Sequence, residues 1–231
     1  MTDSRVDIGR YRLVVFDCDG TLVDSQHNIV AGMIAAWRKH GLDEPTPEAI
    51  RRQVGLTLEV AVARMLATDD PVLIANLANA YREIVRDLRS RAELHEPLFD
   101  GIRDLIDELQ APEIFLGVAT GKNLVGLEHT LQELGLRERF HTLQTPDHCR
   151  SKPDPEMVLR AMAETAVEPG ETVVIGDTTF DIEMACSAGA TAIGVAWGYH
   201  AVEELHAAGA AAVLQHPSEL IHRLQSLSAS R

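Results

Sequence analysis

Short apolar runs alternate with longer helical stripes along most of this chain. The runs at 13–16, 114–119 and 172–175 are almost continuously apolar, a pattern typical of strands that are buried on both faces of a parallel sheet. Weaker runs at 140–144, 191–196 and 211–214 predict three further strands. Gly20 breaks the chain shortly after the first run, at the end of the strand where open α/β sheets bind their ligands.

Helical periodicity fills the intervals between the later runs. Apolar positions spaced by three and four residues predict helices at about 102–109, 124–134, 158–165, 182–188 and 202–208, and a last helix from Ser218. Strand and helix in alternation form a parallel sheet with helices on both faces. We therefore predict an α/β fold with a doubly wound, Rossmann-like sheet.

The first interval is too long for a simple crossover. Nearly a hundred residues separate the first two strong runs, whereas a crossover needs only a dozen or so. Two helical stripes occupy this interval, one through Ile29, Met33 and Trp37 and the other from Leu73 to Leu88. We predict a helical cap at 25–95 inserted into a core formed by 1–24 and 96–231. The alternative is a helical second domain without a catalytic role.

Composition and charge restrict the function. The 231 residues are 45% hydrophobic and 24% charged, as expected for a globular protein, and no apolar run approaches the length of a membrane span. The net charge of −14 would repel nucleic acids and anionic membranes, so we expect neither as a partner. Residues 1–7 lack a secretory pattern, and we expect a cytoplasmic protein. The oligomeric state stays open.

The cysteines do not form a recognisable framework. Cys18, Cys149 and Cys186 are too few and too scattered for a disulfide network or a thiolate zinc site, and we expect reduced thiols. Cys18 lies between two carboxylates, so we expect its side chain to point into the core. Oxidative control at Cys18 is the alternative, although the neighbouring carboxylates should raise the thiol pKa and reduce its reactivity.

Two carboxylates follow the first predicted strand. Asp17 and Asp19 are separated by one residue, and they can converge if the chain turns at Gly20. Carboxylates that lie close together repel each other unless a hard cation lies between them. The pattern indicates a phosphoryl-transfer enzyme, and the alternative is an ordinary Asp-Gly turn after a strand.

Four segments in order carry a family resemblance: 17–25 (DCDGTLVDS), 118–122 (VATGK), 151–155 (SKPDP) and 176–181 (GDTTFD). They resemble the four motifs of the haloacid dehalogenase superfamily, and in particular its phosphoglycolate-phosphatase-like branch. The resemblance spans nearly the whole chain. It implies a Mg²⁺-dependent phosphatase with a helical cap that acts on a small phosphorylated metabolite. The substrates of this branch include phosphoglycolate, sugar phosphates, nucleotides and pyrophosphate.

The resemblance also implies roles for the residues of these motifs. Asp17 would attack phosphorus to form an aspartyl-phosphate, and Asp19 would protonate the leaving group and then activate water. Thr120 and the backbone N–H of Gly121 would bind the phosphoryl group, whose charge Lys152 would neutralise.

Mg²⁺ would be held by Asp17, Asp177 and the main-chain carbonyl of Asp19. Asp181 would support this metal site or reach the ion through water.

Other residues are weaker candidates. Lys122 and Arg150 could assist substrate binding or could only balance charge. Cap and hinge positions that could face the substrate are Gln26, His27, Gly55 and Thr57. Asp19 argues against a dehalogenase, which needs no leaving-group acid. A hexose-phosphate mutase of the β-phosphoglucomutase type stays an alternative, although 55–59 lacks the expected arginine, and so does a non-catalytic phosphoryl-binding protein.

Overall fold

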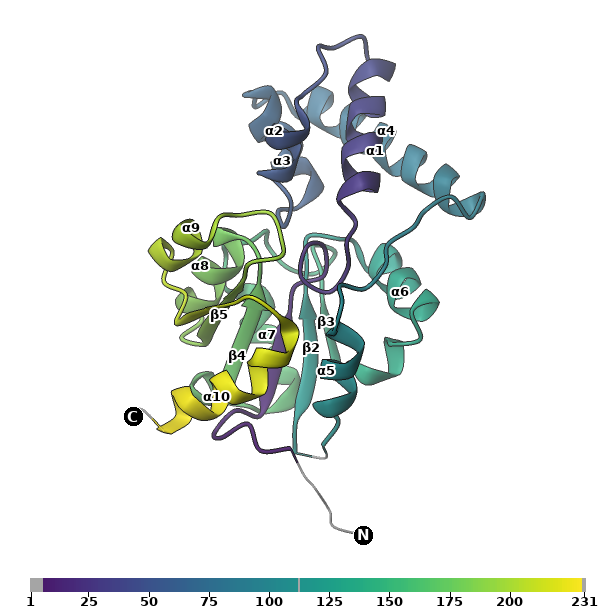
Figure 1. The fold of residues 1–231 in the computed structure, drawn as a ribbon. Helices are drawn as coiled ribbons and strands as arrows, with labels where there is room; N and C mark the ends of the chain where they lie inside the picture. The colour runs from purple at the N-terminus through teal and green to yellow at the C-terminus, as the bar shows by residue number, and fades with distance from the viewer. Residues whose placement is uncertain (1–5, 112, 230–231) are drawn as a thin grey trace.

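A computed structural model describes residues 6–111 and 113–229, so most of the amino-terminal segment considered above lies outside the described residues. The centre of the fold is a six-stranded sheet in the order β3-β2-β1-β4-β5-β6, in which every neighbouring pair is parallel (Figure 1). The strands are β1 (Leu13–Phe16), β2 (Phe115–Ala119), β3 (Thr142–Gln144), β4 (Thr172–Gly176), β5 (Thr191–Val195) and β6 (Ala212–Leu214). The predicted α/β fold with a doubly wound sheet is confirmed.

Alternate residues of β1 explain how helices cover both faces of the sheet. Val14 and Phe16 pack in a cluster with residues of α5 (Ile102–Glu108), α6 (Leu124–Glu133) and α10 (Leu220–Ala229). Leu13 and Val15 point to the other face, toward α7 (Glu156–Thr165), α8 (Thr179–Ser187) and α9 (Val202–Ala207). A central strand between two apolar layers must itself be apolar throughout, as its sequence predicts.

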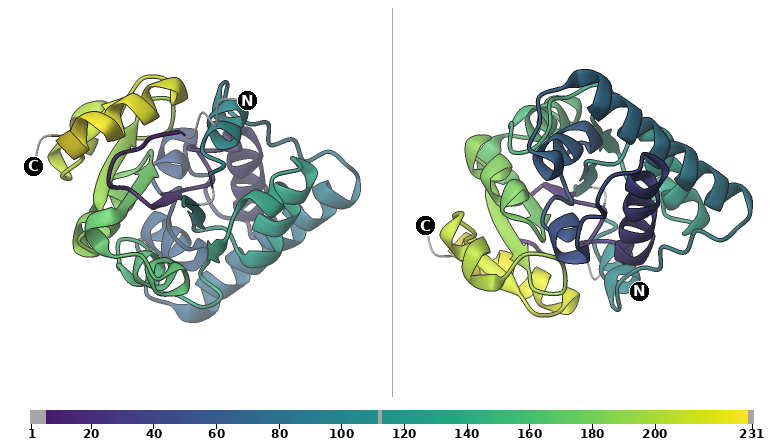
Figure 2. Two further views of the ribbon diagram at one scale, coloured as in Figure 1. Left: turned by 90° about the horizontal axis from the view of Figure 1, so that it is seen from below. Right: turned by 90° about the horizontal axis from the view of Figure 1, so that it is seen from above.

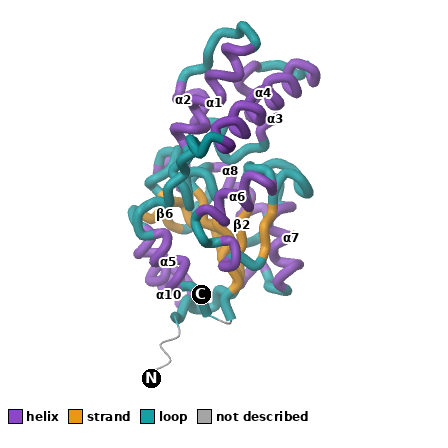
Figure 3. Tube along the Cα trace, turned by 90° about the vertical axis from the view of Figure 1, so that its right-hand side faces the viewer, coloured by secondary structure: helices purple, strands orange, loops and turns teal. Residues whose placement is uncertain are grey.

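Four further helices stand beyond the carboxyl ends of the strands, and we call them the cap helices. They are α1 (Gln26–Lys39), α2 (Pro47–Arg51), α3 (Leu58–Leu66) and α4 (Pro71–Ser90). Figures 1 and 3 show them at one end of the molecule, and the views along that axis in Figure 2 show them above the sheet. Met33, Trp37 and Leu77 from the two predicted stripes are buried in a cluster of the cap helices' own.

The chain enters and leaves the cap helices at neighbouring points. Val23 forms a β-bridge with Leu98, and the backbone N–H of Asp24 donates to the carbonyl of Pro97 at 2.8 Å. Both connections therefore pass over the end of β1. Among the described residues, no helix is long and apolar enough to cross a membrane.

Several predicted boundaries shift by a few residues. The expected strand at 140–144 begins only at Thr142, because Arg137–Arg139 forms a 3₁₀ turn and Phe140 follows it as a core residue. The last helix begins at Leu220, after a separate 3₁₀ turn at Pro217–Glu219. Element ends depend on local turns, which periodicity does not detect.

Candidate active site

Ends of three adjacent strands carry the predicted carboxylates and threonine. Asp17 follows β1, Thr120 follows β2 and Asp177 follows β4. Sheet pairing continues one residue beyond the strands, since the Asp17 N–H donates to Ile175 at 2.8 Å and the Thr120 N–H donates to Gln144 at 3.1 Å. The backbone of Asp17 and Thr120 is therefore fixed by the sheet.

Lys152 joins two of the carboxylates. Its Nζ donates to Oδ1 of Asp17 and to Oδ1 of Asp181, both at 2.6 Å, and all three side chains are at most 1% exposed. Asp17, Asp177 and Asp181 each offer a carboxylate oxygen within 4.8 Å of the others. We call Asp17, Lys152, Asp177 and Asp181 the core cluster.

Asp177 is oriented by two donors and a close glycine. Oδ1 accepts from the Thr21 hydroxyl and Oδ2 from the Tyr199 N–H, each at 2.9 Å. Gly20 has φ +98°, and a Cβ there would lie 2.4 Å from Oδ2 of Asp177. Only glycine fits both the backbone conformation and this approach.

A capping box at the start of α8 positions the side chain of Asp181. It is the third residue of α8, and its Oδ2 accepts from the N–H of Thr178 at 3.1 Å and from the Thr178 hydroxyl at 2.6 Å. This is a capping box, in which the first turn of the helix holds the carboxylate. The other oxygen of Asp181 is left to face Lys152.

The electrostatics of the core cluster are unbalanced. Burial raises the pKa of Asp17 to about 7, although Lys152 opposes the shift. Burial, followed by repulsion from Asp17 and Asp181, holds the pKa of Asp177 well above its ordinary value. Burial alone would lower the pKa of Lys152, but the two carboxylates outweigh it and raise that pKa. With all three carboxylates ionised, one ammonium would leave two excess negative charges in a buried space, and this repulsion contributes to the raised pKa values of Asp17 and Asp177.

A divalent cation fits this space. Oδ2 of Asp17 is buried and has no hydrogen-bond partner, although carboxylate oxygens are costly to bury unpaired. Carboxylates are the ligands that Mg²⁺ prefers, and one such ion would neutralise the excess charge. The side chain of Asp19 is not in this group of carboxylates, whereas that of Asp181 is. Coordination through the Asp19 carbonyl stays a prediction.

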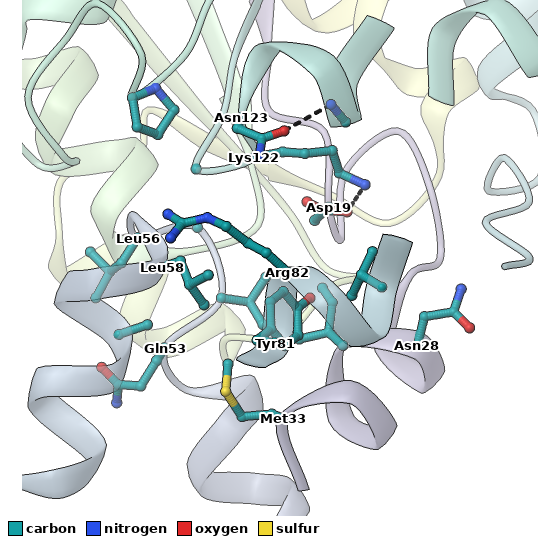
Figure 4. A pocket seen from close by; sticks show the side chains of 18 of the residues that line it. Asp19, Asn28, Met33, Gln53, Leu56, Leu58, Tyr81, Arg82, Lys122 and Asn123 are labelled. Atoms are coloured by element: carbon teal, nitrogen blue, oxygen red, sulfur yellow. Dashed lines mark hydrogen bonds and ion pairs between the residues drawn. The ribbon is translucent and has the colours of Figure 1, made fainter. Parts of the chain in front are cut away.

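Asp19 instead faces a second lysine. Its Oδ1 lies 3.1 Å from Nζ of Lys122, which also donates to Oε1 and Oε2 of Glu96 at 2.9 and 3.0 Å. Figure 4 shows Lys122 pointing at Asp19 on the edge of a cavity. We call Asp19, Lys122 and Glu96 the hinge cluster, because Glu96 lies in the connection that returns from α4. Burial would raise the pKa of Glu96, but Lys122 and the Thr130 hydroxyl outweigh it and lower that pKa.

Thr120 and Gly121 connect the end of β2 to Lys122 of the hinge cluster. The Thr120 hydroxyl accepts from the Lys122 N–H at 3.2 Å, which leaves its own proton free to donate. A Cβ at Gly121 would lie 2.3 Å from the carbonyl oxygen of Leu56, in the loop between α2 and α3. This loop therefore rests directly on the backbone of Gly121. The Thr57 N–H extends the contact by donating to the Ser151 hydroxyl at 3.0 Å.

For several of the weaker candidates the structure favours the alternative to substrate binding. Arg150 is exposed and pairs with Asp154 at 2.9 Å and with Glu156, so it balances local charge and does not line the cavity. Gln26, His27 and Thr57 do not line the cavity either, whereas Gly55 does.

Cys18 lies in the core, as expected. It is fully buried, and burial, reinforced by the Asp19 charge, holds its pKa well above the ordinary value. Both facts argue against oxidative control, because a reactive cysteine needs an accessible thiolate.

Sequence reasoning missed several residues that line the cavity or hold the clusters. Glu96 only marks the start of the second predicted core segment, and its ion pair with Lys122 is a long-range contact that no local pattern encodes. Tyr199 contributes a backbone N–H, so no side-chain signal marks it. Gln53 and three arginines of α4 also line the cavity. The arginines repeat at helical spacing, so the sequence shows them as a charged stripe.

Comparison with known proteins agrees with this geometry. The model of the haloacid dehalogenase-like hydrolase family matches residues 14–195. An N-acetylmuramic acid 6-phosphate phosphatase of Pseudomonas aeruginosa is 35% identical over 219 residues, which cover 92% of this chain and 94% of that protein. A phosphoglycolate phosphatase of Chromobacterium violaceum is 31% identical over 199 residues, covering 84% and 89%.

A solved structure shares the fold. The crystal structure of a predicted phosphatase from Clostridium acetobutylicum superposes with a TM-score of 0.84 at 24% identity and covers 94% of this chain and 99% of that chain.

Proposed function

The chain belongs to the haloacid dehalogenase-like hydrolase family and is a phosphoric monoester hydrolase, and from this premise we propose that Asp17 is its nucleophile in a Mg²⁺-dependent reaction on a small-molecule phosphomonoester. One observation carries the proposal: Oδ1 of Asp17 is held by Lys152, while Oδ2 is buried without a partner. Oδ2 would bind the cation, and Oδ1, oriented by the Lys152 ammonium, would attack the incoming phosphorus atom. An aspartyl-phosphate would form there and be hydrolysed in a second step.

The proposed metal site uses carboxylates of the core cluster. Asp17, Asp177 and the main-chain carbonyl of Asp19 would hold Mg²⁺, and Asp181 would support them through Lys152. The bound ion would neutralise charge on the transferring phosphoryl group.

The remaining steps use residues at the strand ends. Asp19 would donate a proton to the leaving alkoxide and later take one from the attacking water. The Thr120 hydroxyl and the Gly121 N–H would bind phosphoryl oxygens, and the Lys152 ammonium would keep Asp17 ionised and neutralise part of the phosphate charge. Pairing with β3 fixes the backbone of Thr120, and Asp17 and Asp181 hold the ammonium of Lys152.

We further propose that residues 25–95 act as a cap domain over a core of 1–24 and 96–231. The cap helices bury an apolar cluster of their own, which supports this division, and three contacts join residues 25–95 to the core. Arg52 binds Glu204 at 2.6 Å, the Arg64 guanidinium lies 5.2 Å from the centre of the Phe180 ring, and the 55–57 loop rests on Gly121. These contacts enclose the site and would exclude water from it.

Two substrates are candidates. Phosphoglycolate is suggested by the motif resemblance, and one relative carries that activity in its name. The cavity beside Asp19 has a volume of about 490 Å³, and clefts of ~300–1,000 Å³ hold ligands of drug-like size. This volume favours a larger molecule, such as the N-acetylmuramic acid 6-phosphate for which a closer relative is named.

The test is phosphate release from both compounds, with Mg²⁺ and with a chelator, by the wild-type protein and by Asp17→Asn. We expect Mg²⁺-dependent release, and no release by the variant, which retains the volume of the side chain but loses the nucleophile. The matched control is Asp43→Asn, which changes an exposed carboxylate of the cap. Normal release by Asp17→Asn would overturn the mechanism, and isomerisation of a hexose phosphate without release would indicate a mutase.

A further inference from the structure

The cavity extends from the hinge cluster to the cap helices. Asp19 and Lys122 lie at one end, and the opposite wall is formed by α4 together with apolar residues of the other cap helices (Figure 4). The proposed function assigns a role only to the end of the cavity beside Asp19 and Lys122, where the phosphate would bind. The rest of the cavity must receive the alcohol half of the substrate.

Helix α4 presents a row of positive charge to this space. Arg82, Arg86 and Arg89 all line the cavity, and their spacing of four and three residues places them on one helix face. With a rise of ~1.5 Å per residue, the row is about 10 Å long. Figure 4 shows Arg82 extending from α4 toward Leu56 and Leu58.

Two of these arginines form no ion pair with another described residue. Arg82 is bound to Glu59, but within the described part of the chain neither Arg86 nor Arg89 forms an ion pair. The Nε of Arg89 is also buried without a hydrogen-bond acceptor. A buried guanidinium donor without an acceptor is costly, so the geometry calls for an anion at this position.

The carboxylates that line the cavity form no ion pair with Arg86 or Arg89 and have other partners, although the Arg89 charge contributes to the lowered pKa of Glu96. Asp19 and Glu96 share Lys122, and Glu59 holds Arg82. Asp147 accepts from the Leu124 N–H at 2.7 Å and from the Thr145 hydroxyl at 3.0 Å.

A further buried polar atom points to the same ligand. Oε1 of Gln53, also in the cavity wall, is buried and has no donor. It would accept a hydrogen bond from a hydroxyl or an amide N–H. The cavity therefore offers positions for an anion and for a neutral polar group, on a largely apolar surface.

We propose that Arg86 and Arg89 form a subsite for a carboxylate carried by the alcohol half of the substrate, an inference that rests on the proposed phosphatase function. The planar guanidinium fork matches a carboxylate through paired hydrogen bonds. Gln53 binds a hydroxyl or amide of the same group. The substrate class is then a phosphomonoester of an acidic sugar or a similar hydroxy acid.

The test compares two hexosamine phosphates that differ in one acidic substituent. N-acetylmuramic acid 6-phosphate carries a lactyl carboxylate that N-acetylglucosamine 6-phosphate lacks. We expect the wild-type protein to have a higher kcat/KM for the acidic compound. Arg86→Gln and Arg89→Gln should each lower that value by about 10- to 100-fold and leave the neutral compound nearly unchanged, since a hydrogen bond to a charged group is lost.

Arg91→Gln is the matched control. Arg91 follows α4, pairs with Asp87 at 2.8 Å and does not line the cavity, so its loss should change neither value. Arg86 is exposed, so its variant should fold even if Arg89→Gln does not.

The possible failures are distinguishable. Equal kcat/KM for the two compounds, unaffected by either substitution, would overturn the subsite and leave the phosphatase function intact. A preference for glucose 1,6-bisphosphate that both substitutions abolish would show a phosphate subsite and overturn the carboxylate assignment. No hydrolysis of any phosphomonoester would overturn the proposed function itself.

Discussion

The core cluster and the hinge cluster are built alike but lie in different parts of the molecule. In each, one lysine bridges two carboxylates: Lys152 joins Asp17 and Asp181, and Lys122 joins Asp19 and Glu96. The Lys152 side chain has no exposed surface, whereas that of Lys122 is 13% exposed. The first lysine lies beneath the site, and the second lies at the edge of the cavity.

The elements that carry the carboxylates explain why the two lysines differ in exposure. Both partners of Lys152 follow strands of the sheet, Asp17 after β1 and Asp181 at the start of the helix after β4. Glu96, by contrast, lies in the segment that connects α4 to the core, and Asn28 of α1 donates to the neighbouring His95 carbonyl at 2.7 Å. The core cluster is therefore fixed by the sheet, whereas the hinge cluster links Asp19 to the position of the cap helices.

Removing each lysine should have unequal effects. We expect Lys152→Met to lower the free energy of unfolding by ~3–5 kcal/mol, because buried carboxylates lose their only ammonium. Turnover should fall by at least ~10²–10³-fold. Lys122→Met should cost less stability, because its cluster reaches solvent. Urea unfolding in chelator and phosphate release would measure both effects, and equal losses would contradict the distinction.

The response to Mg²⁺ should also distinguish the core cluster from the hinge cluster. Saturating Mg²⁺ at 100 times its Kd contributes about 2.7 kcal/mol, a rise in Tm of about 5–10 °C for a chain of this size. We expect Asp177→Asn to lose most of this rise and Glu96→Gln to retain it, since Asp177 belongs to the group of carboxylates that could hold a metal ion and Glu96 does not. Thermal unfolding with Mg²⁺ and with chelator tests this, and an equal loss in both variants would place the metal elsewhere.

The core half of the site was predictable from sequence because local signals create it. Asp17, Thr120 and Asp177 each follow an apolar run, and the end of a parallel strand fixes where they meet. Lys152 and Asp181 accompany a helix start, which is also a local pattern. The roles of these residues, however, came from the family resemblance and await the experiments above.

The cavity half was not predictable in the same way. Periodicity located the cap helices, because their stripes bury Met33 and Leu77. It did not show which polar residues face the core, since that depends on how the helices stand on the sheet. Gln26 and His27 are candidates from their place in the chain and do not line the cavity, whereas Gln53 and Arg89 do.

Glu96→Gln should reveal whether the hinge cluster positions the general acid. Without one carboxylate, Lys122 is free to bind Asp19 more closely and move it from the leaving group. We expect about a tenfold fall in kcat for an alkyl phosphate, part of the ~10²–10⁴-fold that general acids contribute. The rate for p-nitrophenyl phosphate should not change, because nitrophenolate leaves without a proton. An equal fall for both substrates would indicate a purely structural role.

The ion pair between Arg52 and Glu204 should have the smallest effect, and its pH dependence distinguishes it from pairs inside the cap. The hydrogen bond from Arg52 lowers the pKa of Glu204 from 4.5 to about 2. A carboxylate with a lowered pKa stabilises the fold fully above its unfolded pKa, and that contribution is lost as pH falls through the folded pKa. The Tm difference between wild type and Arg52→Gln should therefore be constant above about pH 4.5 and vanish toward pH 2.

Arg38→Gln provides the control, because Arg38 pairs with Glu44 at 2.7 Å entirely within the cap helices. Both pairs are largely exposed, and neither should change Tm by more than a few degrees. Only Arg52→Gln loosens the cap from the core, so only this variant should raise KM, about twofold, while kcat stays the same. A rise in KM for both variants, or for neither, would show that the Arg52 contact does not help to hold the cap over the site.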